Sequence, residues 1–327
     1  VLLYWLKSEP KKPWADATFH PQVLIQLPVF NEPSVVARVI DAAARMDWKR
    51  LVIQVLDDSK DETSAIAKSR IEYWRDRGLN ITHVQRTDRT GFKAGALAHG
   101  LNLDNSEFVA IFDADFIPES NFLQQLVPLF SDPKVGMVQA RWGHINRNQN
   151  LLTRLVALLL DGHFLIEHTA RYRRNCFFNF NGTAGVWRRD CIQSSGGWAH
   201  DTITEDLDLS YRAQLGGWRF IYRDDLAAPG EVPSTMRAFL TQQHRWAKGT
   251  VQTARKLASR IVRSNFPFVV KLEALNHLCM VAAYPAIFLL ALLLPSSIAA
   301  RQVTIPLDLS LIDLGTILVT TGSLFIF

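Results

Sequence analysis

Short apolar runs alternate with segments of helical character over the N-terminal third of the sequence, and this alternation constrains the fold more than any other feature. Four runs rich in Val, Ile, Leu and Phe have the length of buried strands: 23–30, 51–56, 81–85 and 108–112. Between them lie three segments with the apolar period or the capping residues of helices: 35–46, 61–78 and 91–97. Strands and helices that alternate in this way predict an α/β fold with a parallel sheet.

Acidic residues follow these predicted strands at the points where each strand ends. They are Glu32, Asp57, Asp58, Asp113 and Asp115. Ligands of parallel α/β sheets bind beyond the carboxyl ends of the strands, so we expect these side chains to border one site. Each acid alone has an ordinary alternative, because acids also cap helices and favour their first turns.

Asp113 and Asp115 are one residue apart in an extended segment, so both carboxylates can face the same ligand. Two anions this close repel each other unless a cation or bound protons relieve them. A hard divalent cation, Mg²⁺ or Mn²⁺, shared with a substrate phosphate is the natural partner. Lys93 stands in a turn between Gly91 and Gly95, where a backbone can approach a phosphate closely; a solvated lysine is the alternative.

The second half of the sequence offers three further candidate segments. Residues 177–185 are rich in aromatic and amide side chains, which suit a sugar channel as well as a structural turn. Thr204 is a plausible N-cap, and one of the acids after it, such as Glu205 or Asp206, could act as a general base. Arg245 and Trp246 could hold a pyrophosphate and a sugar ring, or belong to an ordinary amphipathic helix.

The C-terminal part of the sequence indicates a membrane protein. Residues 278–294 and 311–327 are apolar enough to be considered as spans, whereas 151–160 is too short and predicts a core or interfacial helix. Between residues 245 and 271 there are seven Lys or Arg and no acid, which favours anionic lipid over nucleic acid as the origin of the formal net charge of +5. Three cysteines without metal-binding spacing are typical of a reducing compartment.

We therefore divide the chain into four regions. They are an N-terminal membrane-proximal segment at 1–20, a catalytic domain at 21–250, a basic amphipathic interface segment at 251–277, and incomplete transmembrane helices at 278–327.

Six motifs, in this order, resemble those of the processive glycosyltransferases of family 2, which include cellulose, chitin and hyaluronan synthases. The motifs are residues 28–32, Asp57-Asp58, residues 93–95, residues 113–115, residues 204–206, and Gln242 with Arg245-Trp246. The residues of several motifs are most similar to those of cellulose-synthase-like mannan and xyloglucan-backbone synthases and their bacterial relatives. The resemblance covers about residues 21–295.

The resemblance implies a Rossmann-like GT-A fold on the cytoplasmic face of a bacterial inner membrane, or of a Golgi membrane in a eukaryote. It implies Asp206 as the catalytic base and Asp115, with Asp113, as metal ligands. It implies nucleotide-sugar binding by Glu32, Asp57, Asp58, Lys93, Asp113, Gln242 and Arg245. It implies acceptor binding by Trp246, Glu205, Asn181, Gly182 and Thr183. Cellulose synthases carry His where this chain has Phe116, so we expect fewer protein ligands around the metal here.

From these features we expect a membrane-bound inverting β-glycosyltransferase that adds a hexose from UDP-glucose to a growing polysaccharide, alone or in an oligomer or synthase complex. Three alternatives stay open: transfer to a lipid acceptor that yields a glycolipid, mannan synthesis from GDP-mannose, and an inactive membrane scaffold. A glycoside hydrolase is disfavoured, because hydrolysis by paired carboxylates has no need of Lys93 or of groups that hold a diphosphate.

Overall fold

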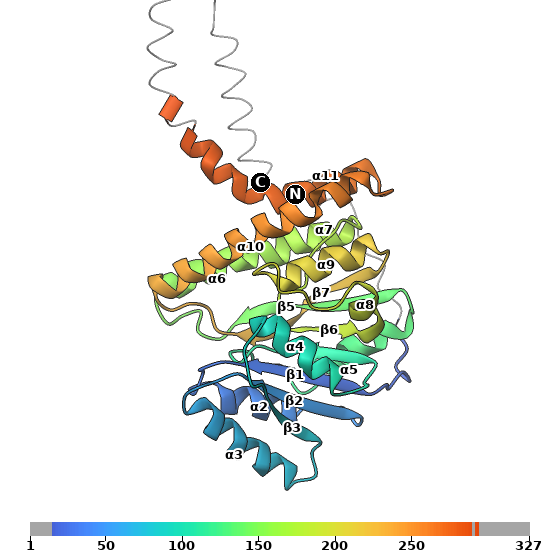
Figure 1. The fold of residues 1–327 in the computed structure, drawn as a ribbon, viewed down its shortest axis with the longest axis vertical. Helices are drawn as coiled ribbons and strands as arrows, with labels where there is room; N and C mark the ends of the chain where they lie inside the picture. Colours follow the sequence, from blue (N-terminus) through green and yellow to red (C-terminus); the bar gives the residue numbers. More distant parts are fainter. Residues whose placement is uncertain (1–14, 290–291, 294–327) are drawn as a thin grey trace, which may run out of the picture.

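The computed structural model describes residues 15–289 and 292–293, and its centre is one seven-stranded sheet (Figure 1). The strands occur in the order β3-β2-β1-β4-β6-β5-β7. Their bounds are β1 Val23–Val29, β2 Leu51–Asp57, β3 Ile81–Gln85, β4 Phe108–Ile111, β5 Val135–His144, β6 Gly185–Arg188 and β7 Arg219–Gly230. The helices that precede β5 are α2 Val36–Ala44, α3 Thr63–Arg75, α4 Phe92–Asn102, α5 Phe122–Leu126 and the 3-10 helix η1 Val127–Ser131.

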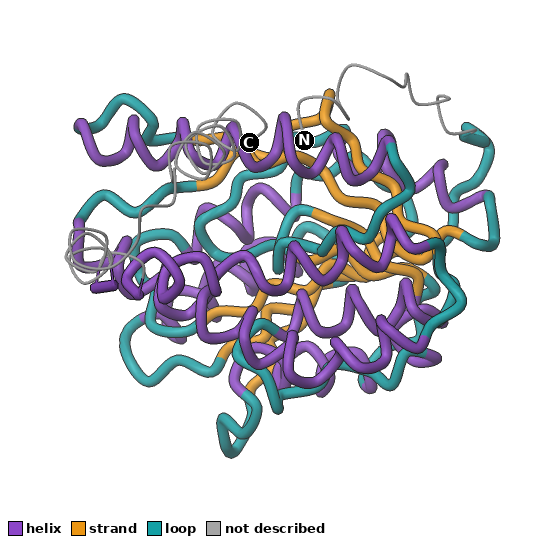
Figure 2. Tube along the Cα trace, turned by 90° about the horizontal axis from the view of Figure 1, so that it is seen from above, coloured by secondary structure: helices purple, strands orange, loops and turns teal. Residues whose placement is uncertain are grey.

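The N-terminal half is the parallel α/β unit that the sequence predicts. Strands β3, β2, β1 and β4 pair in parallel, and every residue of β1 is at least partly buried because helices cover both faces of the sheet (Figure 2). Alternate residues of β1 enter two different cores: Ile25 and Leu27 join the side chains of α2, whereas Leu24 joins Leu97 of α4. The carboxyl ends of these strands therefore lie at one edge.

Beyond β4, outside the region for which the sequence predicts parallel strands, the sheet is mixed. Strand β6 pairs antiparallel with both β4 and β5, while β5 and β7 are parallel to each other. The predicted loop 177–185 leads into β6, which has only four residues. Strand β7 carries Arg223, Asp224 and Asp225 at its centre, beside a register shift, so it lacks the apolar pattern that would predict a strand.

A helical layer covers the second half of the sheet. In Figure 1 the helices α6, α9 and α10 lie above β5 and β7, and α11 lies above these helices. The bounds in this part are α6 Leu151–Asp161, the π-helix η2 Gly162–His168, α7 Thr169–Arg173, α8 Arg189–Ser194, α9 Glu205–Leu215, α10 Met236–Arg263, α11 Phe268–Cys279 and the 3-10 helix η3 Met280–Ala282. A small core joins α9, α10 and α11 through Tyr211, Leu257 and Ala274.

Helix α10 continues without a break across residue 250, where we place the end of the catalytic domain. Helix α6 has two faces: Val156 and Leu160 are buried, whereas Leu155 and Leu158 are exposed, so it is a core helix with an apolar outer side. Within the described part of the chain, the segment Phe268–Leu289 has the length and hydropathy to cross a membrane, and it begins earlier than the predicted span at 278. The predictions for 1–14 and 311–327 lie outside the described residues.

Candidate active site

A cavity of about 930 Å³ lies between the carboxyl end of β4 and helix α10. Its wall includes the start of α4, the loop before β6, the start of α9 and one face of α10. Most of the predicted site residues line it, and these are Lys93, Asp113, Asp115, Asn181, Gly182, Glu205, Asp206, Gln242, Arg245 and Trp246. The structure therefore brings together motifs that are far apart in the sequence.

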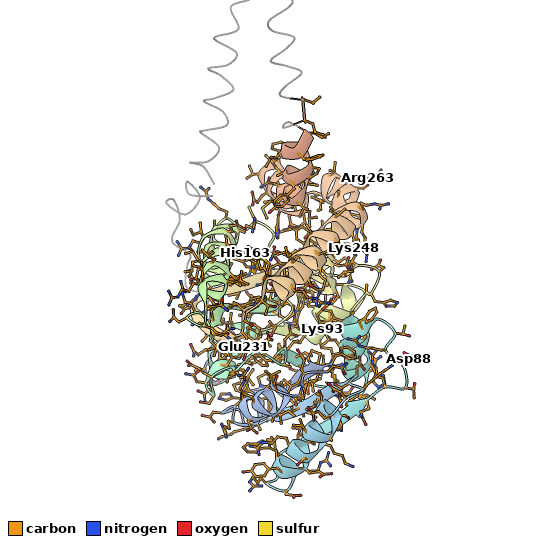
Figure 3. The ribbon with its side chains drawn as sticks, turned by 90° about the vertical axis from the view of Figure 1, so that its left-hand side faces the viewer. Asp88, Lys93, His163, Glu231, Lys248 and Arg263 are labelled. Atoms are coloured by element: carbon orange, nitrogen blue, oxygen red, sulfur yellow. The ribbon has the colours of Figure 1, made fainter. Side chains whose placement is uncertain are left out.

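Lys93 is one of the cations that line this cavity. In Figure 3 it lies in the middle of the molecule, between the blue N-terminal elements and the orange helix α10. Its Nζ is 2.5 Å from Asp113 Oδ1 and donates to the carbonyl of Gly182 at 2.9 Å. Burial opposes the charged amine, but Asp113 and Glu205 outweigh this effect and raise the pKa of Lys93. Lys93 is thus held charged, ready to face a phosphate.

Asp113 and Asp115 follow β4 directly, as the sequence predicts. The backbone N–H of Asp113 donates to Thr183 Oγ1 at 2.9 Å, which fixes the turn. Burial and the neighbouring carboxylates of Asp113 and Glu32 raise the pKa of Asp115 to about 7. Burial, then Asp113, likewise raise the pKa of Glu32. This concentration of negative charge favours a bound divalent cation.

The protein itself offers such a cation few ligands. Among the described residues there is no group of three or more His, Cys, Asp or Glu side chains arranged to hold a metal. Phe116 is buried and packs on Trp142 with 5.3 Å between ring centroids, and an added Cβ on Gly230 would lie 2.6 Å from its ring. Asp115 and Asp113 therefore fit a Mg²⁺ or Mn²⁺ ion whose other ligands come from substrate phosphate and water.

Asp206 lies in the first turn of α9, directly after Glu205. Its Oδ1 accepts from the N–H of Leu207 at 2.8 Å, while its backbone carbonyl accepts from Ser210 Oγ at 2.6 Å. Burial, followed by the charge of Glu205, raises the pKa of Asp206 to about 7, against the effect of Lys93. A carboxylate with a pKa near neutrality is suited to accept a proton as a general base.

The loop 181–183 connects these charged groups through its backbone. Gly182 has a φ of +79°, and an added Cβ would lie 3.2 Å from Asp206 Oδ2 and 3.3 Å from Lys93 Nζ. Gln139 of β5 is fully buried; its Oε1 accepts from Asn181 N at 3.1 Å and its Nε2 donates to Thr183 O at 3.1 Å. Asn181 Nδ2 is buried without a partner and lines the cavity, so it can donate to a ligand.

Helix α10 supplies the opposite wall. Gln242, Arg245 and Trp246 line the cavity, as their three- and four-residue spacing on a helix allows. Gln242 Oε1 is buried without a hydrogen-bond partner. Arg245 is one of the charges that oppose the raised pKa of Glu205, so α9 and α10 meet at this cavity.

Four predicted residues do not line the cavity. Asp57 is buried at the end of β2, where its Oδ2 lies 2.8 Å from His83 Nε2, and hydrogen bonds from His83, Ser64 and Ser59 outweigh burial to lower its pKa. Asp58 pairs with Arg86. The other two are Glu32 and Thr183. The charge of Asp113 contributes to the raised pKa of Glu32, and Thr183 Oγ1 accepts from the backbone N–H of Asp113.

Sequence reasoning missed several residues of the site. Those in the cavity wall include Arg89, His200, Ile203, Glu231, Arg237 and Thr241. They belong to loops and to an exposed helix turn that carry no motif of their own. Gln139 could have been found from the sequence, because a single amide side chain inside an apolar strand needs buried hydrogen-bond partners.

The parallel β1–β4 unit, the acidic pair after β4 and the antiparallel β6 together define the GT-A fold of nucleotide-sugar-dependent glycosyltransferases. The sequence pattern described as "Glycosyltransferase like family 2" matches residues 21–249, so the chain belongs to this family of enzymes. The expected family and fold are thereby confirmed.

Plant glucomannan 4-beta-mannosyltransferases are similar to this chain. Glucomannan 4-beta-mannosyltransferase 2 of Arabidopsis thaliana is 43% identical over 279 residues, which cover 81% of this chain and 52% of that protein. Glucomannan 4-beta-mannosyltransferase 1 of Oryza sativa subsp. japonica is 40% identical over 304 residues, covering 88% and 57% respectively. The chain thus spans about half the length of the relatives it matches.

Solved structures share the fold. The mannosyltransferase PcManGT from Pyrobaculum calidifontis, in complex with GDP-Man and Mn²⁺, superposes with a TM-score of 0.66 at 24% identity, covering 92% of this chain and 87% of that one. S. aureus TarS 1-349 in complex with UDP-GlcNAc superposes with a TM-score of 0.59 at 15% identity, covering 79% and 71%.

Proposed function

We propose that this chain is the catalytic part of an inverting β-mannosyltransferase that extends a polysaccharide from GDP-mannose. One observation carries the reaction type: Asp206, with a pKa near neutrality, shares one cavity with Lys93, Asp115 and Arg245. The names of the relatives at 38–43% identity support mannose as the transferred sugar, because these relatives are glucomannan 4-beta-mannosyltransferases. They do not support UDP-glucose, the donor expected from the sequence.

The mechanism follows from the placement of charge. Asp206 accepts the proton of an acceptor hydroxyl, and that oxygen forms a bond to C1 of the donor sugar from the face opposite the leaving group. The bond between C1 and the phosphate oxygen breaks, and its electron pair stays on the departing diphosphate. Lys93 and Arg245 neutralise the charge that develops there. A divalent cation held by Asp115 and Asp113 supplies further charge neutralisation when bound.

Trp246 and Asn181 are the proposed acceptor contacts. Both line the cavity, Trp246 from α10 and Asn181 from the loop before β6. An aromatic face suits the apolar side of a sugar ring, and the unpartnered Nδ2 of Asn181 suits a sugar hydroxyl. With the apolar segment Phe268–Leu289 in a bilayer, the catalytic domain lies at the membrane surface on the cytoplasmic face, where nucleotide sugars are available.

Transfer of radiolabelled sugar in membranes that contain the full-length protein tests this function. The assay compares GDP-mannose, UDP-glucose and UDP-galactose, with and without Mn²⁺, and then measures product size. We expect metal-dependent incorporation from GDP-mannose into a large product. Incorporation only from UDP-glucose contradicts the donor, a small lipid-soluble product contradicts the acceptor, and absence of both turnover and nucleotide binding contradicts the enzyme.

A further inference from the structure

One face of α10 continues past the cavity and contacts the segment that carries the proposed base. Gln242, Arg245 and Trp246 border the cavity. The same three- and four-residue spacing leads to a second set on this face, Gly249, Gln252, Thr253 and Lys256. The second set contacts residues 201–208, which include Asp206.

Gly249 brings the helix unusually close to this segment. It is buried in the middle of a 28-residue helix, where glycine is unfavourable. An added Cβ would lie 2.4 Å from Thr204 Cγ2 and 2.5 Å from Thr204 Oγ1, so no larger residue fits without a shift. Thr204 is the N-cap residue of α9, yet its side chain does not cap the helix. It faces Thr253 instead, with 3.5 Å between the two Oγ1 atoms.

Two polar contacts fix the register of the two segments. Gln252 Oε1 accepts from the backbone N–H of Ile203 at 2.9 Å, directly before the N-cap. Lys256 Nζ lies 2.7 Å from Asp201 Oδ1 and 2.9 Å from Asp208 Oδ1. Asp208 is fully buried and also pairs with Arg212, so Lys256 is anchored within the protein rather than turned toward solvent.

We propose that Gly249, Gln252 and Lys256 are positioning residues that set the distance between the carboxylate of Asp206 and the guanidinium of Arg245. This inference rests on the proposed function. Because α10 is one continuous helix, a shift at Gly249 moves Arg245, one turn away, relative to the start of α9. Proton transfer and diphosphate departure both need this geometry, whereas binding of the nucleotide uses groups on α4 and after β4 as well.

The test compares Gly249→Ala with the double variant Gly249→Ala/Thr204→Ala, in the full-length protein and in the transfer assay. We expect the single variant to reduce kcat by about a hundredfold, the order of effect of a misplacement near 1 Å, with the affinity for GDP and Mn²⁺ nearly unchanged. The double variant removes Thr204 Cγ2 and Oγ1, the two atoms nearest to the added Cβ, and leaves Thr204 Cβ at 2.8 Å, so it should recover part of kcat. Gly162→Ala is the matched control, because an added Cβ there meets nothing within 4 Å.

Lys256→Met is the second test, with Lys248→Met as control, since Lys248 is an exposed lysine of the same helix (Figure 3). The pKa of Asp206 depends on the charges of Glu205 and Lys93. A variant that displaces Asp206 relative to these two groups should therefore also shift the acid limb of the pH–rate profile. Unchanged kcat in both Gly249→Ala and Lys256→Met overturns the proposal. The proposal is also overturned if Gly249→Ala loses kcat and nucleotide affinity equally and Gly249→Ala/Thr204→Ala recovers neither. A wild type that transfers no sugar contradicts the proposed function instead.

Discussion

Carboxylates at the end of β2 and carboxylates at the cavity have opposite electrostatic surroundings, although the sequence presents them in the same way. Asp57, in the parallel N-terminal half, is buried but receives hydrogen bonds from His83 and Ser59, which lower its pKa. Asp115 and Asp206, at the cavity, are partly exposed and lie beside other carboxylates. Removal from solvent, followed by the charge of these neighbours, raises the pKa of each to about 7. The protein therefore stabilises the anion of Asp57 with its own hydrogen-bond donors. It leaves Asp115 able to bind a cation and Asp206 able to accept the proton of an acceptor hydroxyl.

The comparison shows that burial alone does not identify a reactive acid. Burial opposes ionisation of all three carboxylates, and the sign of each shift depends on the partners that surround them. A carboxylate that already accepts hydrogen bonds from the protein has a low pKa and is a poor proton acceptor. A carboxylate with fewer such donors has a higher pKa, and its anion is stabilised when a substrate or a metal binds or when it accepts a proton.

Asp206→Asn should have the largest effect. The amide cannot accept the acceptor proton, so we expect transfer to fall by roughly 10²–10⁴-fold while binding of GDP and Mn²⁺ survives. Calorimetric titration of nucleotide beside the transfer assay measures both. Asp190→Asn is the control, because Asp190 is an exposed acid in the first turn of α8 and does not line the cavity. Loss of nucleotide binding in Asp206→Asn would make Asp206 a structural residue.

Lys93→Met should weaken transfer less and change its pH dependence more. Asp206 must be ionised to act as a base, so the rate rises with pH through a value near 7. Lys93 lowers the pKa of Asp206, and its removal therefore moves this rise to higher pH. The pH–rate profile of kcat in the wild type and the variant checks the shift. An unmoved acid limb would mean that a different group limits the reaction at low pH.

The N-terminal half and the chemistry of its motifs could be predicted because local signals agree there. The strand at 108–112, the acids after it and Lys93 between two glycines all lie where the periodicity indicates. Strand β7 could not be predicted, since its charged centre gives no apolar alternation. The internal partners of Asp57 depend on the pairing of β2 with β3, which is a tertiary property.

Part of the site was likewise beyond sequence reasoning. The contact of Gly249 with Thr204 joins residues that are 45 positions apart, and nothing local to either residue signals it. His200 and Arg237 enter the cavity wall only because the segments that precede α9 and begin α10 meet there. The family resemblance supplied roles for motif residues, but it carried no information about residues outside the motifs.

The smallest expected effect is on the stability of the protein without ligands, where Asp57 and Asp115 should contribute with opposite signs. The folded-state pKa of Asp57 is lowered, so its carboxylate stabilises the fold above about pH 4 and this contribution is lost as pH falls. The folded-state pKa of Asp115 is raised to about 7, so stability declines as pH rises from about 4 to about 7.

Asp57→Asn should therefore lower Tm at pH 8, whereas Asp115→Asn should raise it, each by an amount on the order of 1 kcal/mol or more in free energy of unfolding. The Asp115 difference should shrink toward pH 4, where its carboxyl is protonated in the folded chain and about half protonated in the unfolded chain. The Asp57 difference should persist at pH 4 and disappear only as the pH falls further. Thermal unfolding in EDTA at about pH 2.5, 4, 6 and 8 measures the difference in Tm between each variant and wild type. Changes in Tm of the same sign at pH 8 would mean that burial, rather than the partners, governs both carboxylates, and the contrast between the end of β2 and the cavity would then disappear.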